Sequence, residues 1–400
     1  MEHNRNSWAP GTPVEANAYN WGGEPVLMPP LEPDNNTDKP TVVDLFCGCG
    51  GFSVGFGWAG LEPILGVDIH PPSLDTYRHN HARAAVVLGD MRRVSERQIA
   101  SAISQSVDVL AAGVPCQGFS LNNRKRWDED ERNFLFQEFV RTARVLKPRI
   151  VVLENVSGLR YSANGAFKAA IAEAIEQLGY RVFFRQLDAS DFGVPQFRRR
   201  VFFVGVSEDM QMGWPVPTHG QGRRQSRVSV WDAIGDLPQL EPGGVADRYD
   251  SPPFSDYQRF LRCDQEVLHN HIAPKHPEAT VVKIAATRPG EPIYKRFKQR
   301  IRLHPERPSP TQVSGGIRAQ YQFGHPNSPR GLTVRERCRI QSFPDAFEIH
   351  GGTVQGRVQT GNAVPPLLAM ALGRELTRML RGEARSEMTE APGPRQLALL

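Results

Sequence analysis

A single cysteine, Cys116, stands in a loop where an attacking thiol would be useful. The apolar run 107–112 before it is typical of a buried parallel strand, and a glycine ends that run. Ligands of open α/β sheets bind just beyond the carboxyl ends of such strands. Polar Gln117 and Ser120 follow within a tight loop and do not suit a core. Cys116 is therefore a candidate nucleophile, and a small buried hydrophobe is the alternative interpretation.

Carboxylates end three other apolar runs. Residues 63–68 and 85–90 end at Asp68 and Asp90, and the run 150–153 is followed by Glu154. An acid at the end of a second strand, about 20 residues after a glycine-rich turn, commonly binds ribose hydroxyls. A carboxylate at the end of a buried strand can also have a raised pKa. The pattern favours an adenosine-type pocket at one sheet edge, although each acid could instead cap a helix.

The first strand, 41–46, runs into a glycine-rich turn at 47–53 and then a short helix. Glycines there let the backbone approach a ligand at a helix N-terminus. The spacing differs from GxGxxG because Ser53 holds the place of the third glycine, so the turn alone is a weak nucleotide-binding signal.

Two arginines alternate along a predicted hairpin between strands at 181–184 and 200–205. Alternation places Arg198 and Arg200 on one face and Arg199 on the other. Two guanidinium groups on one face suit an anionic or carbonyl-bearing ligand, whereas solvated surface arginines are the alternative.

Composition bounds the class of protein. The 400 residues carry a net charge of +5, and 40% are hydrophobic, which is enough for a substantial core. Residues 281–340 contain 13 Lys or Arg against 3 Asp or Glu, which favours an anionic partner. The five cysteines include no CxxC pair, so neither a disulfide framework nor a metal site is predicted. With no signal peptide or long apolar run, we expect a cytoplasmic protein without membrane contact.

The chain divides into five predicted regions. They are a disordered leader at 1–40, in which Trp8 and Trp21 could still dock, an α/β domain at 41–206, an irregular second module at 207–330, a partly helical segment at 331–380, and a disordered tail at 381–400. Within the fourth region, a helix capped by Thr333 and Glu336, a turn at 359–366 and a helix at 367–380 are predicted.

The segment 294–302 interleaves aromatic and basic side chains. Phosphate contacts and base stacking would both be served by this pattern. A solvated basic helix face is the alternative. Its candidate nucleic-acid contacts are Lys295, Arg296, Lys298 and Arg300, to which Gln117 and Ser120 of the cysteine loop are added.

Together these segments resemble the DNA (cytosine-5)-methyltransferase family of bacterial restriction–modification type. Three departures are seen: Asp68 where the family usually has Glu, Val114 where it has proline and Asn133 where it has glycine. None of them removes a catalytic group. The segments that carry the resemblance occur in the family's order at 44–53, 68, 90, 113–120, 132–136, 154–156, 196–200, 307–311, 335–345 and 361–366.

The resemblance implies a Rossmann-like, S-adenosylmethionine-dependent α/β fold, with a mostly parallel twisted sheet, helices on both faces and a smaller irregular target-recognition domain. It makes 41–206 the catalytic and cofactor-binding domain, 207–330 the module that reads the DNA target, and 331–380 the segment that completes the catalytic domain. It implies that Cys116 adds to C6 of a flipped-out cytosine while Glu154 acts at N3. Arg198 would hold the base carbonyl, Arg200 would position Glu154, and residues 121–132 would close as a lid. The implied cofactor contacts are Phe46, Gly48, Gly50, Gly51, Asp68, Ile69, Asp90, Met91, Pro115, Asn362 and Val364.

The implied partner is double-stranded DNA read in one short sequence by a monomer, with a possible restriction endonuclease acting independently. A transfer-RNA methyltransferase shares the chemistry and is the nearest alternative. A DNA-binding regulator without catalysis would be expected to lack part of the set Cys116, Glu154, Arg198 and Arg200, all of which are present. If the chain were a nicotinamide-dependent oxidoreductase, Cys116 and Glu154 would have no evident role.

Overall fold

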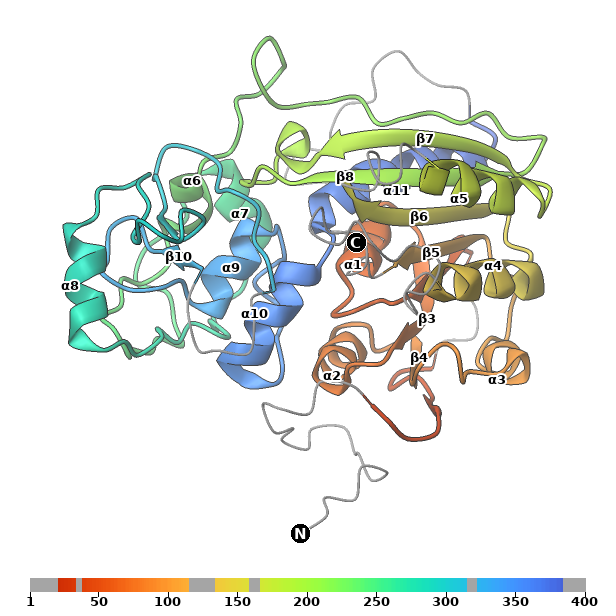
Figure 1. The fold of residues 1–400 in the computed structure, drawn as a ribbon, viewed down its shortest axis with the longest axis horizontal. Helices are drawn as coiled ribbons and strands as arrows, with labels where there is room; N and C mark the ends of the chain where they lie inside the picture. The colour runs from red at the N-terminus through yellow and green to blue at the C-terminus, as the bar shows by residue number, and fades with distance from the viewer. Residues whose placement is uncertain (1–20, 34–37, 115–133, 158–165, 315–321, 384–400) are drawn as a thin grey trace.

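The computed structural model describes residues 21–33, 38–114, 134–157, 166–314 and 322–383. A sheet with helices on both faces forms one lobe, and short helices and irregular chain form a smaller lobe beside it (Figure 1). Within the described segments, no helix is long and apolar enough to cross a bilayer.

The larger lobe is built on one eight-stranded sheet in the order β1-β4-β3-β2-β5-β6-β8-β7. The five strands from β4 to β6 run parallel, and β1, β8 and β7 are added by antiparallel pairing. The central parallel strands are continuous buried apolar runs, as expected where both sheet faces are covered. The strands are β1 Val26–Met28, β2 Thr41–Leu45, β3 Glu62–Asp68, β4 Ala85–Leu88, β5 Val109–Gly113, β6 Ile150–Val156, β7 Arg181–Asp188 and β8 Arg199–Val206.

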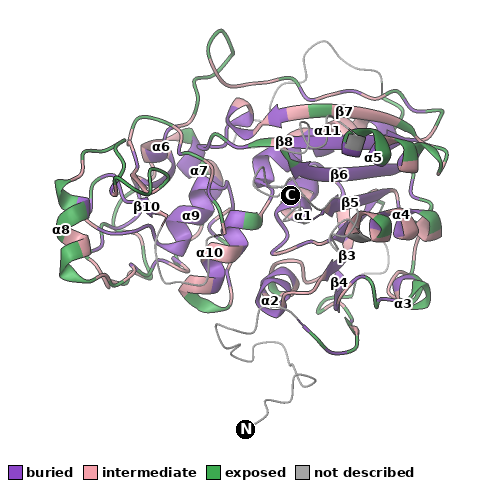
Figure 2. Cartoon of the chain, viewed as in Figure 1, coloured by how far each residue is buried: buried purple, intermediate pink, exposed green. Residues whose placement is uncertain are grey.

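Helices cover both faces of the sheet, and buried residues of the strands and helices form a hydrophobic cluster on each face (Figure 2). α3 Glu96–Ser101, α4 Phe134–Leu146 and α5 Ala166–Glu176 contribute Ile99, Phe139 and Ile171 to the core of one face. α1 Gly51–Trp58 and α11 Pro366–Leu380 cover the other face. α2 Pro71–Asn80 packs near β3 and β4.

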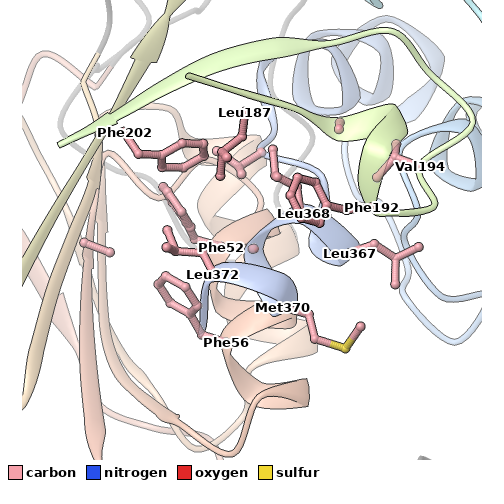
Figure 3. Packing of buried hydrophobic residues seen from close by; sticks show 14 of the residues in the cluster. Phe52, Phe56, Leu187, Phe192, Val194, Phe202, Leu367, Leu368, Met370 and Leu372 are labelled. Atoms are coloured by element: carbon pink, nitrogen blue, oxygen red, sulfur yellow. The ribbon is translucent and has the colours of Figure 1, made fainter. Parts of the chain in front are cut away.

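α1 and α11 lie against each other although they come from opposite ends of the chain. Phe52 and Phe56 of α1 face Leu368 and Leu372 of α11, with Phe202 of β8 beside them (Figure 3). The backbones come so close that a Cβ atom on Gly55 would lie 2.3 Å from the Pro366 carbonyl oxygen. α11 is therefore an integral layer of the large lobe.

The smaller lobe contains α6 Val230–Ile234, α7 Asp256–Arg262, α8 Glu278–Ala286, β9 Ile301–Arg302, β10 Phe323–Gly324 and α9 Val334–Ile340. Its centre is unusually polar, because α9 carries three fully buried arginine or glutamate side chains: Arg335, Glu336 and Arg339. The predicted cap of α9 is confirmed, since Thr333 and Glu336 form a reciprocal capping box.

Three predictions about organisation are corrected. The leader is not wholly disordered, because β1 pairs with β4 and Trp21 is buried. The segment 331–380 does not belong to the catalytic lobe alone: α9 packs on α6 in the smaller lobe, and only α11 covers the sheet.

The predicted turn at 359–366 is also wrong in its first half, where α10 Gly352–Asn362 continues to Asn362. Its glycines serve close packing rather than a turn. A Cβ atom on Gly361 would lie 2.2 Å from the Ser314 backbone nitrogen, and one on Gly356 would lie 2.8 Å from Val334. Glycine in a helix can thus reflect a neighbouring backbone instead of a chain reversal.

Candidate active site

The order of the parallel strands reverses between β2 and β5, so the crevice outside their carboxyl ends is the expected ligand site. β5 ends at Gly113, three residues before Cys116 in the chain. Cys116 itself lies outside the described residues, as do Pro115, Gln117, Ser120 and the predicted lid at 121–132.

A buried ion pair stands next to the end of β5. Glu154 of β6 pairs in register with Gly113, and its Oε1 atom lies 2.8 Å from Nε of Arg200 on β8. Only 11% and 12% of the two side chains are exposed. Burial raises the pKa of Glu154, and the positive charges of Arg200 and Arg198 oppose that rise only in part. The site therefore holds a carboxyl group that keeps its proton more readily than an exposed glutamate.

Arg198 is buried and contacts backbone carbonyls. Its side chain is 1% exposed, and its terminal nitrogens donate to the carbonyl oxygens of Gln312 at 2.8 Å, Gly361 at 3.0 Å and Ala363 at 2.9 Å. Those contacts fix the end of α10 to the segment around residue 312. Backbone carbonyls thus take the terminal nitrogens of Arg198, and Arg200 is the cation beside Glu154, whereas the contact of Arg198 with a base carbonyl stays a prediction.

A cavity of about 460 Å³ adjoins Arg200. Phe197 lies on its wall with 44% of the residue exposed, and the Arg227 guanidinium lies 5.7 Å from the centre of its ring. The volume and mixed lining suit a flat, partly polar ring. The lining residues are Val156, Ser157, Asp188, Phe197, Arg199, Arg200, Thr311 and Val313.

The carboxyl ends of β2 and β3 form a second part of the crevice. Asp68 accepts hydrogen bonds from the backbone nitrogens of Gly48 and His70, both at 2.8 Å. Gly48 has φ +54, and a Cβ atom added there would meet nothing within 4 Å. Phe46, also at positive φ, precedes this turn, and Ile69 follows Asp68. A held carboxylate beside open backbone is the arrangement expected for binding ribose hydroxyls.

Asp90 follows β4 along the same edge and is paired with a cation. Burial works against its charge, but hydrogen bonds from Arg92, the shortest at 2.6 Å, leave the pKa of Asp90 below its ordinary value. Its neighbour Met91 is buried. A ligand amine at Asp90 would therefore share the carboxylate with Arg92.

Gly51 meets Val364 where the first turn touches the segment before α11, whereas Gly50 faces His81 and Tyr77. A Cβ atom on Gly51 would lie 2.2 Å from the Val364 carbonyl oxygen, and one on Gly50 would lie 2.5 Å from His81. Both glycines are required by the packing of protein against protein. Asn362 is exposed at the end of α10, whereas Val364 is buried.

Trp21 lies beside the carboxyl end of β3, although the leader to which it belongs was expected to be disordered. Its backbone nitrogen donates to the Ile69 carbonyl oxygen at 2.7 Å, and Arg93 donates to the carbonyls of Gly22 and Gly23. The arm therefore joins the chain segments that follow β3 and β4. A tryptophan among prolines and glycines was the available signal for this docking.

The predicted nucleic-acid contacts Lys295, Arg296 and Lys298 are exposed on the smaller lobe. They lie in irregular chain between α8 and β9, so the alternative of a basic helix face is wrong. Arg300 is half-buried, with its guanidinium 5.0 Å from the Phe297 ring centre and 5.7 Å from that of Tyr294. Arg300 thus braces the loop through its aromatic neighbours.

The fold and the Glu154–Arg200 pair at the carboxyl edge define a doubly wound α/β enzyme with a ligand crevice at the strand-order reversal. The chain belongs to the C-5 cytosine-specific DNA methylase family, whose model matches residues 40–378. It is a DNA (cytosine-5)-methyltransferase, and the family implies S-adenosylmethionine as the methyl donor.

Similar proteins agree with this assignment. The type II methyltransferase M1.HphI of Haemophilus parahaemolyticus is 35% identical over 86% of this chain and 88% of its own length. M.DdeI of Desulfomicrobium norvegicum is 34% identical over 84% of this chain and 88% of its own length. A prophage-encoded E. coli protein described as a DNA modification methyltransferase shares the fold, with a TM-score of 0.73, 24% identity and coverage of 86% of this chain and 99% of that one.

Proposed function

We propose that this enzyme methylates C5 of cytosine within one short double-stranded DNA sequence, by covalent addition of Cys116 to C6 of a flipped-out base. The observation that carries the proposal is the buried Glu154–Arg200 pair, 2.8 Å apart, beside the strand that leads to Cys116. A base inside a duplex is out of reach, so the target must leave the stack before reaction.

The activation of the base has candidate groups in this chain. C5 of cytosine is a poor nucleophile, and addition of the Cys116 thiolate to C6 makes it enamine-like. The ring nitrogen N3 gains electron density during that addition, and a protonated Glu154 stabilises it by donating a hydrogen bond. Arg200, which lies 2.8 Å from Glu154, would hold that carboxyl group and donate to the base carbonyl. Once C5 has taken the methyl group, loss of the C5 proton and departure of Cys116 restore the aromatic ring.

The carboxyl edge fits S-adenosylmethionine, which when bound supplies an electrophilic methyl group. Asp68, held by two backbone nitrogens beside the open face of Gly48, would bind the ribose. Asp90 would accept from the adenine amine, with Phe46, Ile69 and Met91 as apolar walls. Asn362 would enter from the exposed end of α10.

The biological setting follows from the relatives, which are named type II methyltransferases. We infer that the enzyme protects host DNA from a separate restriction endonuclease of the same specificity. It would act in the cytoplasm as a monomer, with the smaller lobe reading the target sequence.

Bisulfite sequencing tests the substrate and the chemistry together. DNA from a methylation-free bacterial host that expresses this protein should contain protected cytosines in one short repeated context. The same preparation should show no bisulfite-protected position in transfer RNA beyond the empty-vector control. If protein that binds S-adenosylmethionine protects transfer RNA and leaves DNA unmodified, the DNA assignment is overturned.

Replacing Glu154 with glutamine should lower kcat by about 10²- to 10⁴-fold, the usual contribution of a positioned acid. Because burial raises the pKa of Glu154, the wild-type rate should fall as pH rises through that pKa and the proton is lost. Glutamine does not ionise, so the rate of the variant should not fall over the pH range in which Glu154 ionises. Single-turnover rates measured over the whole pH range in which the protein stays folded report both effects. A Glu208→Gln variant, which makes the same change at an exposed glutamate outside the site, is the control.

Replacing Lys295, Arg296 and Lys298 together with glutamine should weaken DNA binding and flatten its salt dependence. Each phosphate contact contributes about 0.9 to the slope of log K against log salt, so the slope should fall by about 2–3. Fluorescence anisotropy at four salt concentrations measures it. Arg83, Arg97 and Arg144, which are exposed on the sheet lobe, form the control triple. An unchanged slope would remove the loop from the DNA interface.

A further inference from the structure

A cluster of metal-binding side chains lies where α2 of the large lobe meets the segment between α9 and α10. His79 of α2 and Glu348 and His350 of that segment present ligand atoms that all lie within 4.8 Å of one another. Nε2 of His79 is 3.7 Å from one Glu348 oxygen, and Nε2 of His350 is 3.8 Å from the other. These groups are far from the Glu154–Arg200 pair in sequence and serve no step of the methyl-transfer chemistry.

The backbone that carries the cluster is fixed to α2. The Asn80 side chain donates to the Glu348 carbonyl oxygen at 2.8 Å and accepts from the Glu348 backbone nitrogen at 3.0 Å. Thr76 accepts from the His350 backbone nitrogen at 2.9 Å. Three hydrogen bonds thus fix the segment at 348–350 against α2. Little backbone conformational entropy therefore remains to be lost when the side chains bind an ion.

The orientation of His350 gives an independent indication of a metal ligand. Its Nδ1 atom lies 3.3 Å from a carboxylate oxygen of Asp75, one turn before His79 on α2. Its other ring nitrogen, Nε2, is buried and has no hydrogen-bond partner among the described residues. A carboxylate that fixes one nitrogen of a histidine while the other faces a cluster of ligands is the usual outer-sphere arrangement of zinc-binding histidines.

We propose that His79 Nε2, His350 Nε2 and the Glu348 carboxylate bind a divalent transition-metal ion, with zinc the best match. Two imidazoles and one carboxylate are a ligand set that zinc accepts, and they disfavour calcium and magnesium, which take oxygen ligands. Ligands of a tetrahedral zinc ion lie about 3.4 Å apart. The observed 3.7 and 3.8 Å, and the 4.8 Å within which all three ligand atoms lie, require side-chain rotations that bring the ligands closer together.

The fourth position faces solvent, because 50% of His79 and 35% of Glu348 are exposed. Water or a neighbouring side chain can fill it. His269 of the smaller lobe stands nearest, with Nδ1 3.5 Å from the Glu348 carboxylate. The ion would join the smaller lobe to α2, the helix that directly follows Asp68 and His70, and would so restrain the two lobes relative to each other.

Zinc titration of the tag-free full-length protein at pH 7.5 tests the site. Isothermal calorimetry should give one zinc ion per chain, and cobalt substitution should give the visible absorption of a four-coordinate ion. The double variant His79→Ala/His350→Ala should lose both signals. His304→Ala, which changes a histidine outside the cluster, should keep them.

Asp75→Asn provides a finer test, because it keeps all three ligands. Loss of an outer-sphere carboxylate typically lowers metal affinity about 10- to 100-fold, and we expect that loss here. Equal zinc affinity in wild type and in the double variant would overturn the proposal, as would the absence of stoichiometric binding in wild type. Matching circular dichroism of the metal-free proteins ensures that folding is not the cause.

Discussion

Cys116→Ala is expected to abolish methyl transfer while leaving DNA binding intact. Without the thiolate, C5 of the target base never becomes enamine-like, so the loss should reach several orders of magnitude, as when other enzymes lose their nucleophile. Affinity for DNA comes mainly from phosphate contacts elsewhere and should change little. Transfer of a radiolabelled methyl group and a gel-shift assay with cognate duplex measure the two properties separately.

The control for this variant is Cys263→Ser, which alters an exposed free cysteine of the smaller lobe. It should keep wild-type activity. A duplex containing 5-fluorocytosine at the target should trap wild-type protein covalently, since the fluorine cannot leave as a proton does. No trapping should occur with Cys116→Ala. Retained turnover in the alanine variant would contradict the covalent mechanism.

Arg339→Met should be the most destabilising substitution in the smaller lobe. The Arg339 guanidinium is fully buried and bonds both Asp345 and Asp236, the latter at 3.2 Å, as well as the Ala233 carbonyl oxygen at 2.8 Å. Methionine fills similar space but removes the nearest cation of two buried carboxylates, leaving Asp345 with Arg335 at 3.6 Å and Asp236 with Arg262 at 3.7 Å. Breaking one side of a buried charge network costs about 3–5 kcal/mol, and urea unfolding followed by circular dichroism should show that loss in the free energy of unfolding.

Arg259→Met tests whether burial is the reason. Arg259 pairs with Asp256 at 2.7 Å, but 85% of the Asp256 side chain is exposed, and such pairs contribute about 0–1 kcal/mol. Similar unfolding curves for the two variants would contradict the role assigned to burial. The triple variant Arg339→Met/Asp236→Asn/Asp345→Asn should recover part of the stability, because the uncompensated charges are gone.

Much of the larger lobe follows from local patterns. Short, continuous apolar runs predict the central strands β2 to β6, because only strands covered on both faces read that way. The Thr333–Glu336 spacing predicts the start of α9 through a mechanism confined to four residues. Asp68 and Glu154 could be placed at one edge because parallel strands bring their carboxyl ends together.

Long-range packing explains what local patterns miss. Alternation put Arg198 and Arg200 on one face, but it could not show that carbonyls from residues 312, 361 and 363 surround Arg198. The short strand β1 depends on an open edge at β4, which no window of sequence contains. His79 and His350 approach each other only after the two lobes meet.

The packing of α1 against α11 also determines how early during synthesis the larger lobe can complete its folding. About 300 residues separate Trp58 from Pro366, and a ribosome needs roughly 15–60 s to add them at 5–20 residues per second. During that interval Phe52 and Phe56, which α11 later covers, remain without their final partners. A nascent chain therefore spends most of its synthesis with an apolar face uncovered, and a host short of chaperones would lose newly made enzyme at this stage.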